Sequence, residues 1–241
     1  MIFGNSLNEA AKELHDKLYT TEFDPVSLRK DLEAGRYDTD AVNMAALEYV
    51  DNCMLQVQEI EWDGEKAIPG ETNPQLESGH IKEAVELLLD FGLDPNRVFT
   101  YPDSKDECNI MHELYLIDNG YQGADTLYLL LSHGGNPDLM VDMEHLYTDP
   151  YYDLWFDTVN RDMLTRSLYS AKIHYCMVLI GFGAGAGREG GLPVEPVGRF
   201  DLSELRNHRN YYVGAIHSDK SDEGMELCFF DRKTNWEVAR Y

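Results

Sequence analysis

The sequence predicts a mainly α protein, in which a solenoid of helical repeats is closed by a small C-terminal antiparallel β meander. Three observations support this prediction. An apolar triplet followed by glycine and an Asp/Asn-Pro turn occurs at 87–96 and again at 129–138. After residue 181, glycine and proline become frequent and short strand-like runs follow. The length of 241 residues suits a short repeat array, although it also fits one large domain or two small ones.

The first region, residues 1–61, is predicted to be helical and to contain a degenerate repeat. Ser6 and Glu9 have the spacing of a capping box at a helix start. Asp24 is a good N-cap, and Gly35 can end the next helix in the left-handed conformation. We therefore expect helices over 7–19, 25–34 and 40–59, followed by a loop-like segment over 62–79.

The second region, residues 79–185, is predicted to be the repeat array. In each copy the apolar triplet ends an amphipathic helix, the glycine caps it, and proline forces a turn. Weaker copies occur at 31–35 and 178–185. Such a unit cannot bury its apolar face alone, so it must stack on a neighbour.

This array resembles a known family. Gly79-His80, the helix that follows and the closing Leu-Leu-Leu-Asp-Phe-Gly-Leu-Asp-Pro-Asn look like the second half of an ankyrin repeat. Asn109-Ile110-Met111-His112 resembles the opening of the next repeat. The clear match covers 79–138, about a quarter of the chain. The resemblance implies a protein-binding scaffold in which His80 and His112 are structural.

The third region, residues 186–241, is predicted to be small and β-rich, with strands over 211–216, 226–231 and 237–241. A formal GxGxxG pattern occurs at Gly185–Gly190. A dinucleotide site needs a strand before this pattern and a helix after it, whereas Leu192-Pro193 follows here. We therefore interpret the pattern as a turn and predict no cofactor.

Signals for catalysis and metal binding are absent from the sequence. The eight histidines include no pair at helical spacing, and the four cysteines include no CxxC. We predict no metal site and no enzyme. An alternative is an enzyme that binds an anionic substrate through basic residues of the last third, for which ion pairing is the simpler role: Arg188, Arg199, Arg206 and Arg209.

The charge is strongly uneven. The chain has 44 acidic and 20 basic side chains, for a net charge of −24. The net charge is −11 over 1–80, −13 over 81–160 and zero over 161–241. This excess disfavours direct binding to nucleic acid or to anionic lipid, because phosphates are repelled. Without a long apolar run or a signal peptide, we expect a cytoplasmic protein with no membrane contact.

The candidate partner-binding residues are aromatics and carboxylates in the two connections that follow the glycine-proline turns. They are Tyr101, Asp103, Asp106, Glu107, Asp142, Glu144, Tyr147, Asp149, Tyr151, Tyr152, Asp153 and Asp157. Aromatics supply rigid contact area and carboxylates supply negative potential, which together suit a basic protein. In the alternative interpretation, Tyr151, Leu154, Trp155 and Phe156 form the core face of a divergent repeat helix, and the carboxylates form an ordinary solvated face.

Together these features predict a non-enzymatic acidic binding protein. The sharpest form of the hypothesis is an inhibitor or immunity-type protein that blocks a toxin, a nuclease or another nucleic-acid-binding protein by imitating nucleic-acid charge. Ankyrin-like proteins do occur as bacterial immunity proteins, which is an analogy at the level of the fold. The alternative is a general ankyrin scaffold or adaptor without an inhibitory role.

Overall fold

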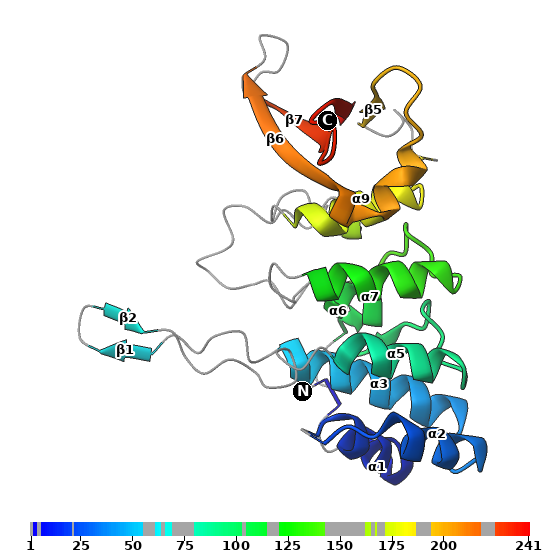
Figure 1. Ribbon diagram of the computed structural model, residues 1–241. Helices are drawn as coiled ribbons and strands as arrows, with labels where there is room; N and C mark the ends of the chain where they lie inside the picture. Colours follow the sequence, from blue (N-terminus) through cyan, green and yellow to red (C-terminus); the bar gives the residue numbers. More distant parts are fainter. Residues whose placement is uncertain are drawn as a thin grey trace. The chain divides into compact units, whose positions relative to one another are not determined.

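The computed structural model describes most of the chain (Figure 1). The described residues are 2–3, 6–20, 22–54, 61–63, 66–68, 80–102, 105–114, 121–142, 162–164, 167, 172–186, 194–217 and 225–241. The chain divides into two compact units. The first unit comprises Met1–Gly135 and Val141–Val159, and the second comprises Asn136–Met140 and Asn160–Tyr241. The boundary expected at residue 185 falls inside the second unit.

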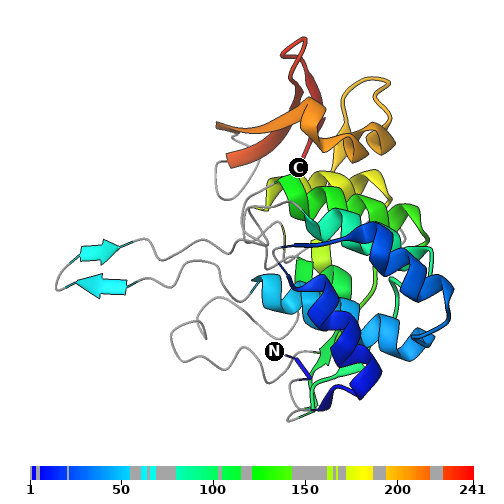
Figure 2. The same cartoon turned by 60° about the horizontal axis from the view of Figure 1, so that its bottom comes forward.

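The first unit is built from packed helices (Figures 1 and 2). They are α1 (Glu9–Leu18), α2 (Pro25–Glu33), α3 (Thr39–Met54), α5 (His80–Leu89), α6 (Ile110–Leu114) and α7 (Tyr121–Ser132). α3 packs against both α1 and α6, and α5 packs against α2, α3 and α7. Leucines on the facing sides form the core, among them the fully buried Leu14, Leu47, Leu88 and Leu127. Burial of these apolar faces stabilises helices that are too short to persist alone.

The predicted glycine caps are confirmed. Gly92 and Gly134 have φ values of 98° and 92°, in the left-handed region. The amide after each glycine turns back to the preceding helix: Leu93 donates to the Leu88 carbonyl at 3.0 Å. The predicted capping box at Ser6 is wrong, because Asn8 caps α1 by accepting from the Ala11 amide.

Short antiparallel hairpins accompany the helices. Strands β1 (Glu61–Asp63) and β2 (Lys66–Ile68) pair within the segment that the sequence analysis interpreted as a loop. Strands β3 (Phe99–Thr100) and β4 (Glu107–Cys108) pair directly before α6.

In the second unit, the described residues include an α-helix, two 3₁₀ helices and a four-stranded antiparallel sheet. These elements are α9 (Ile173–Gly181), β5 (Glu195–Pro196), the 3₁₀ helices η2 (Leu202–Arg206) and η3 (His208–Asn210), β6 (Tyr211–His217), β7 (Met225–Asp231) and β8 (Glu237–Arg240). The strand order is β5-β8-β7-β6. α9 packs on η2, and the three predicted C-terminal strands are confirmed as β6, β7 and β8.

The predicted fold class, a mainly α ankyrin-like solenoid with a small β tail, is wrong. The described residues form a mixed α/β protein, with strands in both units and a four-stranded sheet in the second. The last apolar segment of the predicted array, at 178–181, lies in α9 and belongs to the sheet-containing unit. The local signals for helix ends were correct, but they did not determine which neighbour each helix packs against.

Candidate protein-binding surface

The β3–β4 hairpin carries the first group of predicted binding residues and is held firmly to the helices. Asn109, which is fully buried, donates from its side-chain amide to the carbonyls of Pro95 and Arg97, both at 2.8 Å. Its side-chain oxygen accepts from the Met111 amide at 2.8 Å. Phe99 packs edge-on against Phe3, with ring centroids 5.2 Å apart. The hairpin therefore has a fixed base.

The structure brings the two predicted segments together at one point. The Glu107 amide donates to the Asp142 carbonyl, and the Asp142 amide donates to Glu107 Oε2 at 2.9 Å. Asp142 is exposed and Glu107 is half-buried. These two carboxylates can therefore act at a common surface.

The other predicted residues lie differently. The carboxylate of Asp106 was expected to face solvent. This prediction is wrong, because the residue is only 2% exposed. Tyr101 is half-buried and its hydroxyl donates to Glu113 Oε1 at 3.0 Å. The remaining eight lie outside the described residues: Asp103, Glu144, Tyr147, Asp149, Tyr151, Tyr152, Asp153 and Asp157.

Sequence reasoning missed a group of buried carboxylates behind the hairpin. Glu48, Asp51 and Glu113 are at most 6% exposed. Glu48 accepts from the Phe3 amide at 2.8 Å. Burial raises the pKa of the Asp51 carboxyl, and the charge of Glu48 adds to the shift. Glu48 and Asp51 are three residues apart in α3, a spacing that places both carboxylates on one helix face. The surrounding stretch is apolar, however, and by itself predicts only a core helix.

The same carboxylates act on neighbouring groups. Burial, followed by the charge of Glu113, raises the pKa of the Tyr101 hydroxyl and that of the Cys108 thiol well above their usual values. The Cys108 sulfur donates to the Phe99 carbonyl at 3.6 Å. Since the thiolate is the reactive form of cysteine, Cys108 is a packing residue and not a nucleophile.

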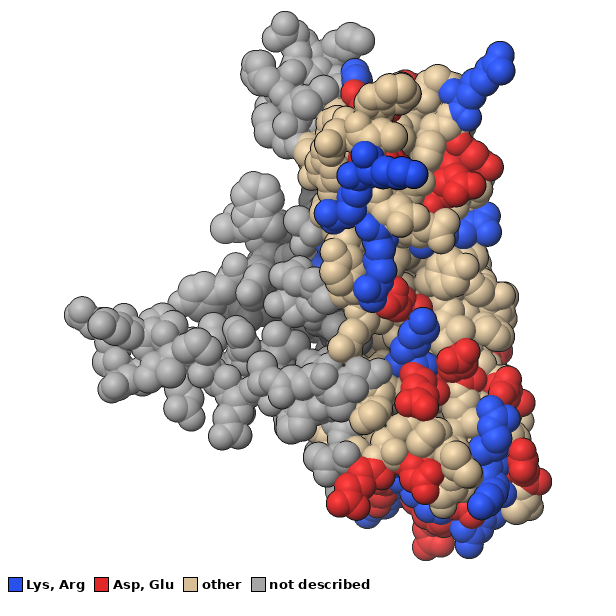
Figure 3. Space-filling model, in the orientation of Figure 1, with Lys and Arg blue, Asp and Glu red and all other residues tan. Residues whose placement is uncertain are grey.

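Among the described residues of the first unit, four cations form ion pairs with carboxylates: Lys17, Arg29, Arg36 and Arg97. Arg29 contacts Asp90 at 2.8 Å, and Arg97 contacts Asp40 at 2.9 Å. Figure 3 shows cations and carboxylates interleaved over the lower end of the view, where α1 and α2 lie. These ion pairs engage four cations, and the first unit keeps an excess of carboxylates over cations.

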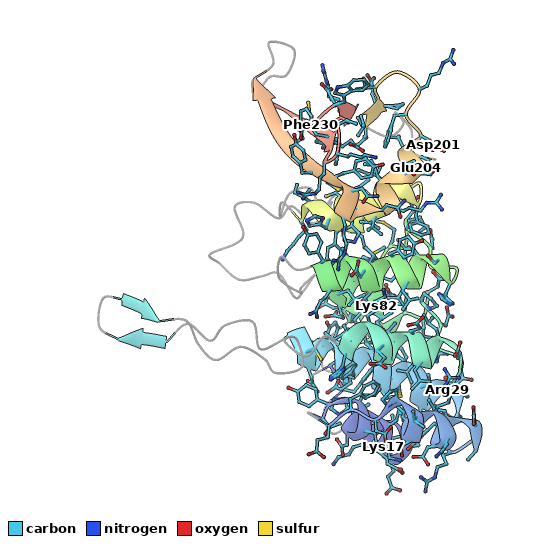
Figure 4. All side chains as sticks on the ribbon, viewed as in Figure 1. Lys17, Arg29, Lys82, Asp201, Glu204 and Phe230 are labelled. Atoms are coloured by element: carbon cyan, nitrogen blue, oxygen red, sulfur yellow. The ribbon has the colours of Figure 1, made fainter. Side chains whose placement is uncertain are left out.

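A small network around Lys17 on α1 shows this pattern in detail (Figure 4). Lys17 Nζ lies 2.9 Å from Glu13 and 2.8 Å from Asp31, and Arg36 also contacts Asp31 at 2.9 Å. Burial lowers the pKa of Lys17, but hydrogen bonds to Asp31, Tyr37 and Glu13 outweigh it, so its pKa is raised. The amine is therefore a fixed positive charge within an acidic surface.

The exposed side of α2, α5 and α7 provides a second surface that the sequence analysis did not single out. Glu33 on α2 and Glu83 and Glu86 on α5 are exposed, and α5 packs against both α2 and α7. On α7, Tyr121 and Tyr128 are each 39% exposed. The two tyrosines are seven residues apart, a spacing that places them on one face of the helix. This spacing could have indicated an aromatic surface from the sequence alone. The exposed carboxylates of α2 and α5 thus lie on helices that neighbour the tyrosine-bearing α7 through α5.

His133 and Gly185 make structural hydrogen bonds. His133 Nδ1 hydrogen-bonds to the Leu129 carbonyl at 2.9 Å at the end of α7. The Gly185 amide donates to Asp138 Oδ1 at 2.7 Å, so a carboxylate occupies the amide that a phosphate would need. Across the described ranges, no group of three or more His, Cys, Asp or Glu side chains is arranged to hold a metal ion.

Comparisons with protein-family models, with curated proteins and with solved structures find no match to this chain. Among the helices that the structure describes, none has the length and apolar character needed to cross a bilayer. Function is therefore inferred from the residues of this chain alone.

Proposed function

We propose that the first unit is a binding module for a basic protein, and that it inhibits this partner by covering its nucleic-acid-binding face. One observation carries the proposal. The first unit contains 32 acidic and 9 basic side chains, a net charge of −23, whereas the second has 12 and 11, a net charge of −1. The division into units thus follows the division in charge.

Local contacts support an outward role for this charge. Arg29 and Arg97 are already paired, and within the described residues Glu33 and Glu86 form no ion pair. A partner that brings lysines or arginines can pair with these carboxylates without displacing an existing cation. Tyr121 and Tyr128 add the aromatic contact area that protein interfaces favour.

Inhibition follows from the same chemistry. A protein that binds nucleic acid presents cations spaced to meet phosphates. Carboxylates fixed on packed helices can meet those cations, because their positions are held by the core and not by long flexible loops. Electrostatic steering then gives fast, salt-sensitive association.

The test uses purified cationic nucleases, with cationic proteins that bind no nucleic acid for comparison. Affinity is measured calorimetrically at about 50 mM and about 300 mM NaCl, and nuclease activity is assayed in parallel. We expect one nuclease to bind, to lose activity, and to bind at least tenfold more weakly at about 300 mM salt. Affinity independent of salt contradicts the electrostatic mechanism, and binding without loss of activity favours an adaptor role.

Matched variants locate the surface. The triple variant Glu33→Gln, Glu83→Gln, Glu86→Gln is expected to weaken binding by about three- to tenfold, since each exposed pair contributes up to about 1 kcal/mol. The control is Glu195→Gln, an exposed carboxylate on β5 in the second unit, with no change expected. If the triple variant and Glu195→Gln weaken the affinity equally per charge removed, then the total charge decides binding, and not the surface of α2 and α5.

A further inference from the structure

Strand β6 forms one edge of the four-stranded sheet, because the strand order is β5-β8-β7-β6. The strand is 7 residues long and contains no charged residue and no proline. Natural sheets usually protect an edge of this length with lysine, proline, a bulge or a covering segment. An uncovered edge strand is a template on which another strand can pair.

The register shows which backbone groups point outward from this edge. The Arg232 amide donates to the Asn210 carbonyl at 2.8 Å, and hydrogen bonding alternates along antiparallel strands. Even-numbered residues of β6 therefore bond to β7. The Leu227 and Tyr241 backbones exchange hydrogen bonds at 3.1 and 2.8 Å, which confirms that odd-numbered residues of β7 bond to β8.

It follows that Val213 and Ala215 direct their backbone N–H and C=O groups away from β7. Within the described residues, the backbone of Val213 has no hydrogen-bond partner. The first residue of the strand is different. The Tyr211 amide donates to the His208 carbonyl, and the Tyr211 carbonyl accepts from Arg232 Nε at 2.9 Å. The available edge therefore begins after Tyr211.

We propose that β6 is a dimerisation edge, which pairs antiparallel with β6 of a second copy about a two-fold axis at Gly214. This register places Val213 of one copy opposite Ala215 of the other, so that their outward N–H and C=O groups bond reciprocally. Gly214 lies at the axis. It has no side chain, and a Cβ there would come within 3.0 Å of Phe230, which is labelled on the sheet in Figure 4.

Charge favours a second copy as the occupant of this edge. The unit that contains β6 has a net charge of only −1, so two such units do not repel each other as two acidic units would. At the Tyr211 end of the strand, Arg209 and Arg232 accompany Asp231, which lies opposite Tyr211, whereas Glu226 lies opposite Ile216 near the other end. Antiparallel self-pairing brings these two arginines of each copy towards Glu226 of the other.

The test is the oligomeric state of the full chain, measured by sedimentation equilibrium at rising concentration. We expect a mass approaching twice 27.6 kDa. Val213→Pro removes the outward N–H without removing a β6–β7 hydrogen bond, so it should give a monomer. Val213→Ala keeps the N–H and is the matched control, which should still dimerise. A wild type that stays monomeric, or a folded Val213→Pro that still dimerises, overturns the proposal.

A second measurement decides the matter if the proline variant does not fold. Hydrogen exchange of the Val213 and Ala215 amides in the wild-type protein is followed at a low and a high protein concentration. We expect slower exchange at high concentration for these two amides, with no change for the Tyr212 amide, which is already bonded to β7. Exchange at Val213 that does not depend on concentration overturns the proposal, whatever the mass.

Discussion

At the scale of single residues, buried asparagines connect the turns of the first unit to its helices. Asn43 is 2% exposed, and its amide donates to the Thr39 and Gly92 carbonyls at 2.7 and 3.0 Å. Its side-chain oxygen accepts from the Asp94 amide at 2.9 Å. Asn109 bonds in the same way to the segment before the β3–β4 hairpin. Each asparagine thus hydrogen-bonds with backbone groups of a turn and fixes that turn against the helices.

Replacing Asn109 should therefore be costly. Asn109→Ala leaves the buried Pro95 carbonyl, the part-buried Arg97 carbonyl and the buried Met111 amide without this partner. We expect a loss of about 2–4 kcal/mol in the free energy of unfolding, measured by urea denaturation. The comparison is Asn8→Ala, which removes an exposed N-cap and should cost only about 1 kcal/mol. Equal losses in the two variants would show that the buried network contributes little.

The buried carboxylate of Asp51 predicts a specific pH dependence. Its pKa is raised above the usual 3.8 by burial, so ionisation opposes folding. The stability associated with a neutral Asp51 is fully present below the usual pKa of 3.8, and it is lost as the pH rises through the higher pKa of the folded state. Asp51→Asn should therefore increase the melting temperature by a few degrees at pH 7, with a gain that shrinks towards acid pH. A gain that is the same at acid and neutral pH would contradict this explanation.

Residue-level prediction from sequence succeeded where the signal was local. Asp24 caps α2 as expected, by accepting from the Val26 and Ser27 amides. Asp106 was misjudged, because nothing in a run of polar residues shows that one carboxylate turns inward. Burial depends on how the chain around Asp106 packs in three dimensions, which the local run of residues does not encode.

At the scale of elements, the contact between α9 and η2 depends on a glycine. A Cβ on Gly181 would lie 2.5 Å from the backbone nitrogen of Arg206, and Arg206 Nε donates to the Gly181 carbonyl at 2.8 Å. The Arg206 guanidinium also stacks on Phe182, with its central carbon 4.8 Å from the ring centroid. The end of the helix and the 3₁₀ turn therefore touch through their backbones.

Gly181→Ala should separate these two elements. We expect a loss of about 1–3 kcal/mol from overpacking, together with faster hydrogen exchange in α9. Gly183→Ala is the matched comparison, since a Cβ there meets no atom within 4 Å and only the positive φ of 86° opposes it. That variant should cost about 1 kcal/mol. A smaller effect at Gly181 than at Gly183 would contradict the close-contact account.

Elements with strong local patterns were predictable, and their arrangement was not. The strands β6, β7 and β8 alternate or contain β-formers between turn residues, and they were found. The β1–β2 hairpin was missed because its strands are only 3 residues each, too short for a periodic signal. The grouping of α9 with the sheet depends on non-local packing, which repeats in sequence do not encode.

At the scale of the whole molecule, nearly all of the net charge resides in one compact unit. A unit with a net charge of −23 is destabilised by its own repulsion, and salt screens this repulsion over about a Debye length. The stability of the two units should therefore respond differently to ionic strength.

Raising NaCl from about 20 mM to about 0.5 M should slow hydrogen exchange in the helices of the first unit and leave the sheet of the second nearly unchanged. Exchange is read by mass spectrometry on peptides from each unit in the same sample. The Lys17 network loses some attraction at high salt, so its peptides are expected to show the smallest gain within the first unit. A uniform response in both units would contradict the charge argument.

The placement of the cysteines gives each unit its own chemical reporter. Cys53 and Cys108 lie in the first unit, Cys176 and Cys228 lie in the second, and all four are buried thiols. Burial also raises the pKa of Cys53 and Cys176 to about 12. A thiol reagent can therefore modify the protein only when a unit opens. Identifying which cysteines are alkylated, and how fast, measures the opening of each half separately in the unmodified chain.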